Sequence, residues 1–401
     1  MKSLKELFKI GKGPSSSHTM GPQKAASIFW GRNPQAARFE VTLYGSLAAT
    51  GKGHMTDAAI EDILLPHAPT KILWEPTVFL PFHPNGMRFV AYDKEDKQTD
   101  EWVVYSVGGG ALSEGKEDSK TLATPDVYDL HTLKDIMKWC YDNGCAYWEY
   151  VDRCEDKDIW DYLMNVWETM KQSVEKGLSH EGVLPGPLHL PRKAAIYYVK
   201  AKGYKASLQS RGLVYAYALA VSEENASGGT IVTAPTCGSS GVLPAVLYHL
   251  STAHGFSDTR ILYALATAGL FGNIVKHNAS IAGADVGCQG EVGVACAMAS
   301  AAACQLFGGS PAQIEYAAEM GLEHHLGMTC DPVCGMVQIP CIERNAFAAA
   351  RALDSNLYAA FSDGRHNVSF DRVVNVMKQT GHDLPSLYKE TGEGGLAVIQ
   401  H

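Results

Sequence analysis

The stretch Val294-Ala-Cys-Ala-Met-Ala-Ser-Ala-Ala-Ala303 decides the class of fold. Its side chains are apolar or small on every side of a helix, so the stretch has no polar face to offer to water. A helix of this composition is buried all round, and its neighbours are other helices. The sequence therefore predicts an all-helical domain around a buried central helix.

Further helical windows lie on both sides of this stretch. From about residue 156 onward the strand pattern almost disappears, and apolar residues recur at helical spacing. The windows are 159–177, 192–201, 207–223, 241–254, 258–276, 291–307, 311–321 and 342–354. We therefore assign residues 156–401 to the helical domain.

The chain before this domain has a different pattern, which predicts an α/β domain with a mixed sheet. Strand-like segments alternate between apolar and polar residues, and segments with helical spacing lie among them. The strand segments are 38–44, 71–74, 87–92 and 101–107, and the helical segments are 23–30, 56–64 and 130–141. The whole chain is thus predicted to have an α+β fold with two domains, 1–155 and 156–401.

Composition and charge exclude several classes of protein. The chain has 401 residues, of which 46% are hydrophobic and 19% charged, as in well-packed globular proteins. Its net charge of −9 argues against a nucleic-acid partner, because phosphate binding needs a basic face. The N-terminus lacks a secretory signal, and no run reaches the roughly 20 apolar residues of a membrane helix. We expect a cytoplasmic protein with no nucleic-acid or membrane partner.

Ten cysteines in such a chain are expected to be thiols that serve in packing, metal binding or catalysis. Cys296 and Cys304 lie on the predicted central helix and are typical core residues. The segments 278–291 and 330–341 instead place cysteines beside Gly or Pro in loops. Their spacing lacks the paired Cys-x2-Cys of structural zinc sites and favours an iron–sulfur cluster.

Two loops near the N-terminus carry a histidine among small residues. Gly11-Lys-Gly-Pro-Ser-Ser-Ser-His-Thr-Met-Gly-Pro22 gathers three serines, a threonine and His18 ahead of a helical segment. Such a turn can hold a carboxylate at a helix N-terminus, although an ordinary N-cap is the simpler alternative. In Gly51-Lys-Gly-His-Met-Thr-Asp57, His54 lies between glycines rather than on an apolar helix face. Histidine is readily poised for proton transfer, so both loops are candidate parts of an active site.

A third loop, Val232-Thr-Ala-Pro-Thr-Cys-Gly-Ser-Ser-Gly241, precedes a helical window. It fits a pocket for a substrate carboxylate, or a site where Cys237 acts as a nucleophile beside a distant histidine. A tight helix entry capped by Ser239 or Ser240 explains the loop equally well.

Four motifs connect these loops with a known family. They are Gly-Pro-Ser-Ser-Ser-His-Thr at 13–19, Glu-Asn-Ala-Ser-Gly-Gly at 224–229, Asn-Ala-Ser-Ile-Ala-Gly-Ala-Asp-Val-Gly-Cys-Gln-Gly-Glu at 278–291 and Cys-Asp-Pro-Val-Cys-Gly-Met-Val-Gln-Ile-Pro-Cys-Ile-Glu-Arg-Asn at 330–345. Together they resemble the iron–sulfur L-serine dehydratases, bacterial L-serine ammonia-lyases that use no pyridoxal phosphate. The resemblance spans nearly the whole chain, in the single-chain arrangement with the β-domain first and the α-domain second.

The resemblance implies a cofactor and a reaction. It makes Cys288, Cys330 and Cys341 the ligands of a 4Fe–4S cluster, in which one iron has no protein ligand. That iron is expected to act as a Lewis acid on the substrate hydroxyl while a histidine removes the α-proton, so that L-serine gives pyruvate and ammonia. The resemblance also implies a homodimer and a site between the two domains.

The resemblance further assigns the two histidines and the Ser-rich turn. His54 is the expected base, and His18 is expected to orient the substrate or to handle the proton of the leaving hydroxyl, although the two roles are interchangeable at this stage. The residues expected to bind the substrate all lie in the Ser-rich turn and are Ser15, Ser16, Ser17 and Thr19.

Three features depart from the family pattern. Cys334 stands where the family usually has glycine, so it is either a spare thiol near the cluster or a competing ligand. Cys237 stands where an asparagine is common, which puts a substrate contact there in doubt. Some members end in a cysteine that occupies the open iron, whereas this chain ends in Gly-Leu-Ala-Val-Ile-Gln-His. Either the iron is open at rest, or His401 or the terminal carboxylate covers it.

Other functions remain to be distinguished. A pyridoxal-phosphate lyase would need a Schiff-base lysine, for which Lys276 is the candidate, but no phosphate-binding Gly loop accompanies it. L-Threonine or L-cysteine as substrate would require only a changed pocket. An amino-acid sensor on a helical scaffold is the third alternative, and it would leave the loop cysteines unexplained.

Overall fold

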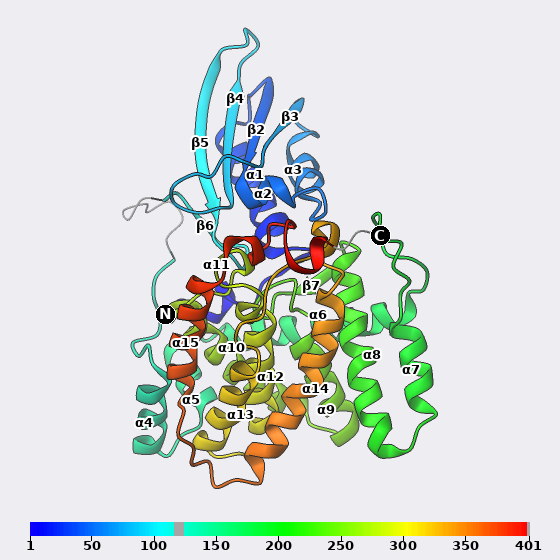
Figure 1. The fold of residues 1–401 in the computed structure, drawn as a ribbon. Helices are drawn as coiled ribbons and strands as arrows, with labels where there is room; N and C mark the ends of the chain where they lie inside the picture. The colour runs from blue at the N-terminus through cyan, green and yellow to red at the C-terminus, as the bar shows by residue number, and fades with distance from the viewer. Residues whose placement is uncertain (116–123, 399–401) are drawn as a thin grey trace.

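The structure is a computed structural model that describes residues 1–115 and 124–398. A part that contains a mixed sheet stands on a larger helical body, and the C-terminal segment, drawn red, lies at their junction (Figure 1). This arrangement confirms the predicted α+β fold.

The sheet has five strands in the order β3-β2-β4-β5-β6. Their bounds are β2 Arg38–Tyr44, β3 Thr70–Glu75, β4 Gly86–Tyr92, β5 Gln98–Ser106 and β6 Leu112–Ser113. β2 pairs in parallel with β3 and antiparallel with β4, so the sheet is mixed as predicted. The parallel pair needs a crossover, which the helices α2 (Gly45–Ala49) and α3 (Thr56–Leu64) provide. This crossover carries His54.

Aromatic packing holds the helix α1 (Gly21–Arg32) against this sheet. Phe29 of α1 is fully buried, and its ring lies 5.4 Å from the ring of Phe89 and 6.0 Å from that of Phe39. The core of this part is confined to residues between 25 and 112. The Ser-rich turn, which directly precedes α1, is thereby fixed to the sheet.

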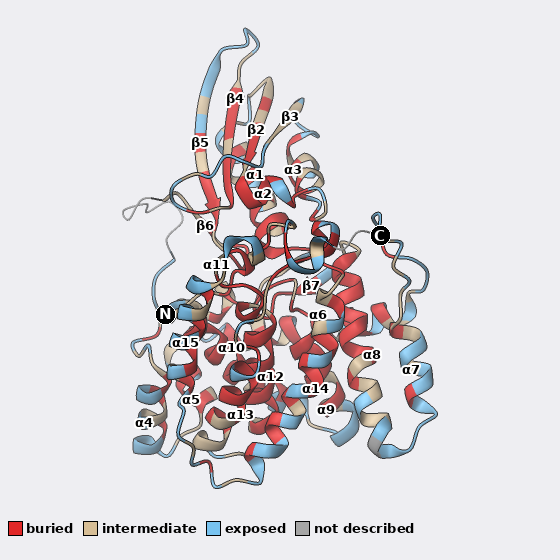
Figure 2. Cartoon of the chain, viewed as in Figure 1, coloured by how far each residue is buried: buried red, intermediate tan, exposed pale blue. Residues whose placement is uncertain are grey.

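The helical body is built around α12 (Val292–Leu306), in which every residue except Gln305 is buried (Figure 2). Its neighbours include the helices α9, α10, α13 and α14. The helices of the body are α4 Leu133–Asn143, α5 Tyr147–Cys154, α6 Ile159–Ser179, α7 Ala194–Lys202, α8 Ala206–Ala226, α9 Val242–His254, α10 Asp258–Asn278, α11 Gly283–Val286, α13 Pro311–Glu323, α14 Cys341–Ala360 and α15 Phe370–Asp383. The buried central helix was therefore predicted correctly, whereas α5, α11 and α15 fall outside the predicted windows.

The first residues of the chain belong to the core of the helical body rather than to the sheet. Met1, Leu4, Leu7 and Phe8 are fully buried there. The short strand β1 (Ile10–Lys12) pairs antiparallel with β7 (Thr230–Val232), which follows α8. The chain therefore starts in the helical body and passes into the sheet part through the Ser-rich turn. The division after residue 155 stays a prediction.

No helix in the described ranges has both the length and the apolar character to cross a membrane.

Candidate active site

The Ser-rich turn is a buried structure, unlike an ordinary exposed N-cap. Ser15 precedes a short π-helical segment, η2 (Ser16–Met20), which runs directly into α1. The Ser15 hydroxyl accepts the backbone N–H of His18 at 3.1 Å, and the Ser15 N–H donates to Thr19 Oγ1 at 3.1 Å. The Ser17 hydroxyl lies 2.9 Å from His18 Nδ1. These bonds fix the direction of the His18 ring.

The two histidine loops are tied together by two hydrogen bonds, in each of which a threonine hydroxyl of one loop donates to the backbone of the other. Thr19 Oγ1 donates to the carbonyl of His54 at 2.7 Å, and Thr56 Oγ1 donates to the carbonyl of His18 at 2.6 Å. The two imidazole rings are consequently 4.5 Å apart at an angle of 45°. The structure therefore brings His18 and His54 together, although they lie 36 positions apart in the sequence.

Burial sets the protonation of both rings. It lowers the pKa of His54 from 6.5 to about 4. Burial, with His54 as a neighbour, also lowers the pKa of His18 well below 6.5. Both imidazoles are therefore neutral near pH 7. His54 Nδ1 lies 3.1 Å from Thr50 Oγ1, whereas its Nε2 is buried without a hydrogen-bond partner within the described chain.

The three cysteines predicted as ligands meet in one small cavity at the junction of the two parts. Cys288 begins the turn η3 (Cys288–Gly290), Cys330 lies in a loop bridged to Lys389, and Cys341 begins α14. The cavity is lined by Ser15, His54, Gly238, Cys288, Glu291, Cys330, Pro332, Val337, Cys341 and Glu390. The predicted ligands and the predicted base thus face the same space.

One arginine supports a thiolate among these cysteines. Hydrogen bonding from the Cys330 thiol lowers the pKa of Cys288 against the effect of burial, and the nearby guanidinium of Arg344 lowers it further. Arg344 itself is held by a hydrogen bond from Nη1 to the carbonyl of Thr329 at 2.7 Å. Deprotonated sulfur is the form that binds metal. Ligand atoms of Cys288, Cys330 and Glu291 lie within 4.8 Å of one another, which suits a metal centre.

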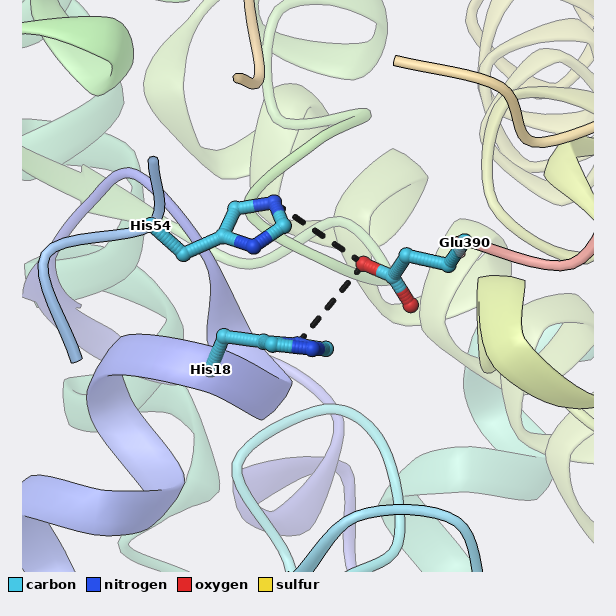
Figure 3. Close-up of side chains that lie close together, drawn as sticks. All are labelled: His18, His54 and Glu390. Atoms are coloured by element: carbon cyan, nitrogen blue, oxygen red, sulfur yellow. Dashed lines mark ion pairs between the residues drawn. The ribbon is translucent and has the colours of Figure 1, made fainter. Parts of the chain in front are cut away.

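Two carboxylates of the cavity were missed by sequence reasoning. Glu291 ends one of the quoted motifs, so its position beside Cys288 was the available signal. Glu390 lies far along the chain in a segment without a motif, and no local pattern pointed to it. Its Oε1 atom is 3.7 Å from His18 Nδ1 and 4.0 Å from His54 Nε2 (Figure 3). Burial raises the pKa of each carboxyl to about 8.

The remaining candidate residues occupy different surroundings. Ser15 lines the cavity, while Ser16, Ser17 and Thr19 are buried behind it. Cys237 is buried with its sulfur 3.4 Å from Met20 Sδ, and burial raises the pKa of its thiol, which does not suit a nucleophile. Cys334 is exposed and does not line the cavity among the described residues.

The other candidates lie elsewhere. Lys276 donates from Nζ to the carbonyl of Glu6 at 2.7 Å and is not among the cavity-lining residues that the structure describes. His401 lies outside the described residues.

A neutral imidazole and three cysteines line one buried cavity, which is typical of an enzyme with an acid–base group and of a site that could hold a metal. Comparison with known proteins gives the family. Residues 3–73 match the serine dehydratase beta chain family, and residues 86–397 match the serine dehydratase alpha chain family. The chain therefore belongs to the L-serine dehydratase family, with the beta-chain part preceding the alpha-chain part in a single polypeptide.

Full-length relatives agree with this assignment. The chain is 39% identical to L-serine dehydratase of Haemophilus influenzae, over 99% of both chains. It is 40% identical to L-serine dehydratase of Streptomyces coelicolor, over 99% of this chain and 98% of the relative. It is also 39% identical to L-serine dehydratase TdcG of Escherichia coli, over 99% of both chains.

Proposed function

We propose that this protein is an L-serine dehydratase, an ammonia-lyase that converts L-serine to pyruvate and ammonia by β-elimination. One observation carries the proposal: two neutral, buried histidines lie together at the cavity that three cysteines line. β-Elimination needs a base for the α-proton and assistance for the departure of hydroxide, and this cavity offers groups for both. Relatives that bear this activity in their names match the chain over nearly its full length.

The donor set fits an iron–sulfur cluster, the cofactor that this family is known to use. Cys288, Cys330 and Cys341 are the three thiols that line the described part of the cavity, and Arg344 favours the deprotonated form of Cys288. We assign them as the ligands of a 4Fe–4S cluster. When bound, such a cluster supplies a Lewis acid that eases the loss of hydroxide.

The contacts of the two rings favour His54 as the base. Both nitrogens of His18 have neighbours, since Nδ1 lies 2.9 Å from Ser17 Oγ and Nε2 lies 3.4 Å from Ser46 Oγ. His54 Nε2, by contrast, is free to accept the α-proton. His18 then orients the substrate and passes the proton that His54 has taken up on to the departing hydroxide, which leaves as water. The aminoacrylate so formed tautomerises and hydrolyses to pyruvate and ammonia.

The Ser-rich turn is the proposed site for the substrate carboxylate. Ser15 contributes the hydroxyl that lines the cavity. Ser17 and Thr19 act by holding His18 and the backbone of His54, and Ser16 belongs to the same buried segment. The turn thus connects carboxylate binding with the placement of both rings.

A homodimer is part of the proposal. Large apolar side chains are exposed along α7, the loop that follows it, the start of α8 and α14. Contiguous patches of this kind mark protein interfaces. These side chains include Ile196, Val199, Tyr204, Leu208 and Phe347. Light scattering is expected to give twice the chain mass of 43.3 kDa.

Product analysis tests the function. Protein reconstituted with iron and sulfide under anaerobic conditions is expected to form pyruvate from L-serine, and parallel assays with L-threonine and L-cysteine measure its preference. Borohydride treatment with substrate is expected to leave activity intact, because no lysine imine forms. Inactivation with a reduced adduct on Lys276 would favour the pyridoxal-phosphate alternative. Amino-acid binding without turnover by the cluster-loaded protein would favour the sensor.

A further inference from the structure

Glu390 is a cavity group to which the proposed mechanism assigns no task. It follows the turn η5 (Ser386–Tyr388) in the C-terminal segment and is 6% exposed. Its N–H donates to the carbonyl of Cys330 at 2.8 Å, and its own carbonyl accepts the Ser46 hydroxyl at 3.0 Å. Its φ of +59° lies in the left-handed region, which a residue other than glycine adopts rarely. Both parts of the protein therefore hold this side chain in the cavity.

The carboxylate of Glu390 has no cationic partner in the part of the chain that the structure describes. The imidazoles of His18 and His54, which lie within 4.0 Å of it, are both neutral near pH 7. No described Lys or Arg lies within 4.0 Å of it, and its remaining recorded contact is the backbone amide of Ala284. Burial raises the pKa of this carboxyl to about 8, because ionising it without a cation is costly. The position therefore suits a ligand that brings a positive charge and stabilises the ionised form.

The second carboxylate of the cavity is already engaged. Glu291 Oε1 accepts the Thr236 hydroxyl at 2.8 Å, and its Oε2 lies 3.9 Å from the sulfur of Cys330. Glu291 therefore lies beside Cys330. The Glu390 carboxyl lies beside the two histidines (Figure 3).

We propose that Glu390 binds the α-ammonium group of the amino-acid substrate and thereby positions the α-proton against His54. This inference rests on the proposed function. In an amino acid the ammonium nitrogen is bonded to the carbon that loses the proton, so the acceptor of the ammonium and the base must be close neighbours. Glu390 Oε1 and His54 Nε2 are 4.0 Å apart, which permits both contacts.

The assignment explains a preference for amino acids over their analogues without the amine. A ligand that lacks the ammonium forms no charged hydrogen bond with the Glu390 carboxyl, and the loss of such a bond costs roughly ten- to a hundredfold in affinity. The role of Glu390 is therefore discrimination of the substrate class as well as positioning.

A matched pair of ligands tests this role. L-Alanine carries the ammonium and propionate does not, and neither can undergo the elimination. Calorimetry is carried out on the full chain, reconstituted anaerobically. It is expected to show that Glu390→Gln lowers the affinity for L-alanine at least about tenfold and changes the affinity for propionate less than about twofold. Glu393→Gln removes an exposed carboxylate three residues further along the same segment and is expected to change the affinity for neither ligand. With L-serine, KM is expected to rise more than kcat falls in Glu390→Gln.

Several results would overturn the assignment. It would be overturned if Glu390→Gln lowered the affinity for both ligands equally, or did not lower the affinity for L-alanine. It would also be overturned if the wild-type protein bound L-alanine no more tightly than propionate. Iron and sulfide content shows whether a variant is loaded; if Glu390→Gln does not fold, Glu390→Asp is measured, and a smaller but still ligand-selective loss is expected. Pyruvate formation by wild type without this ligand pattern would refute the ammonium site alone. The ligand pattern without pyruvate formation would refute the proposed function alone.

Discussion

Replacement of His54 by asparagine separates the base from everything else in the site. The asparagine amide can keep the contact that His54 Nδ1 makes with Thr50 Oγ1 at 3.1 Å, but it has no counterpart of the unpartnered Nε2. Loss of a general base typically lowers the rate about 10²- to 10⁴-fold, which corresponds to about 3–5 kcal/mol on the barrier. The three cysteines are untouched, so iron and sulfide content is expected to equal that of wild type.

The assay is the initial rate of pyruvate formation from saturating L-serine, measured anaerobically beside iron and sulfide analysis of the same samples. His67→Asn is the matched control, because this histidine is exposed and stacks on Trp30 at 4.1 Å, away from the cavity. It is expected to retain full activity. A loaded His54→Asn protein with wild-type kcat would refute the assignment of His54 as the base.

Further predictions concern the cluster ligands, acid stability and the junction. Cys288→Ala is expected to lose cluster and activity together, whereas Cys334→Ala is expected to keep both, as iron analysis and pyruvate assays would show. The pKa of His54 is about 4 in the folded protein and 6.5 in the unfolded chain, so the unfolded chain takes up the proton first as pH falls. Its contribution to stability is therefore complete above about pH 6.5 and is lost as pH falls through 4; the loss between pH 7.5 and 4.5 is on the order of 2–3 kcal/mol, and urea unfolding of wild type against His54→Asn measures it. A Cβ on Gly53 would lie 2.6 Å from the carbonyl oxygen of Gly335. Gly53→Ala must therefore shift the sheet part relative to the helical body. We expect at least about a tenfold loss of kcat/KM with the cluster retained, and an unchanged kcat/KM would contradict the close approach.

The central helix shows where sequence reasoning about the fold succeeds. The stretch 294–303 has one possible environment, a shell of other helices, and α12 has that environment. The three-residue strands β1 and β7 could not be predicted, because three residues are too few to show an alternating pattern. α15 did carry a signal, since its buried residues recur at helical spacing and Ser369 caps it, but this signal was not recognised.

The site illustrates the same division between local and distant information. His18, His54 and the loop cysteines lie in segments with unusual local composition, which made them candidates, and the resemblance to a family then assigned their roles. Glu390 became part of the site through backbone pairing of its segment with Cys330 and through the bond from Ser46, 344 positions away. Likewise, nothing local indicated that the first eight residues belong to the helical core, because their partners lie on distant helices.

Air sensitivity of turnover tests the central claim most directly. The protein is reconstituted anaerobically with iron and sulfide, and pyruvate formation from L-serine is measured before and after exposure to air, with the cluster followed by its visible absorbance. The account predicts that turnover is present at first and disappears in step with the cluster. Turnover that survives air and the removal of iron would contradict the account.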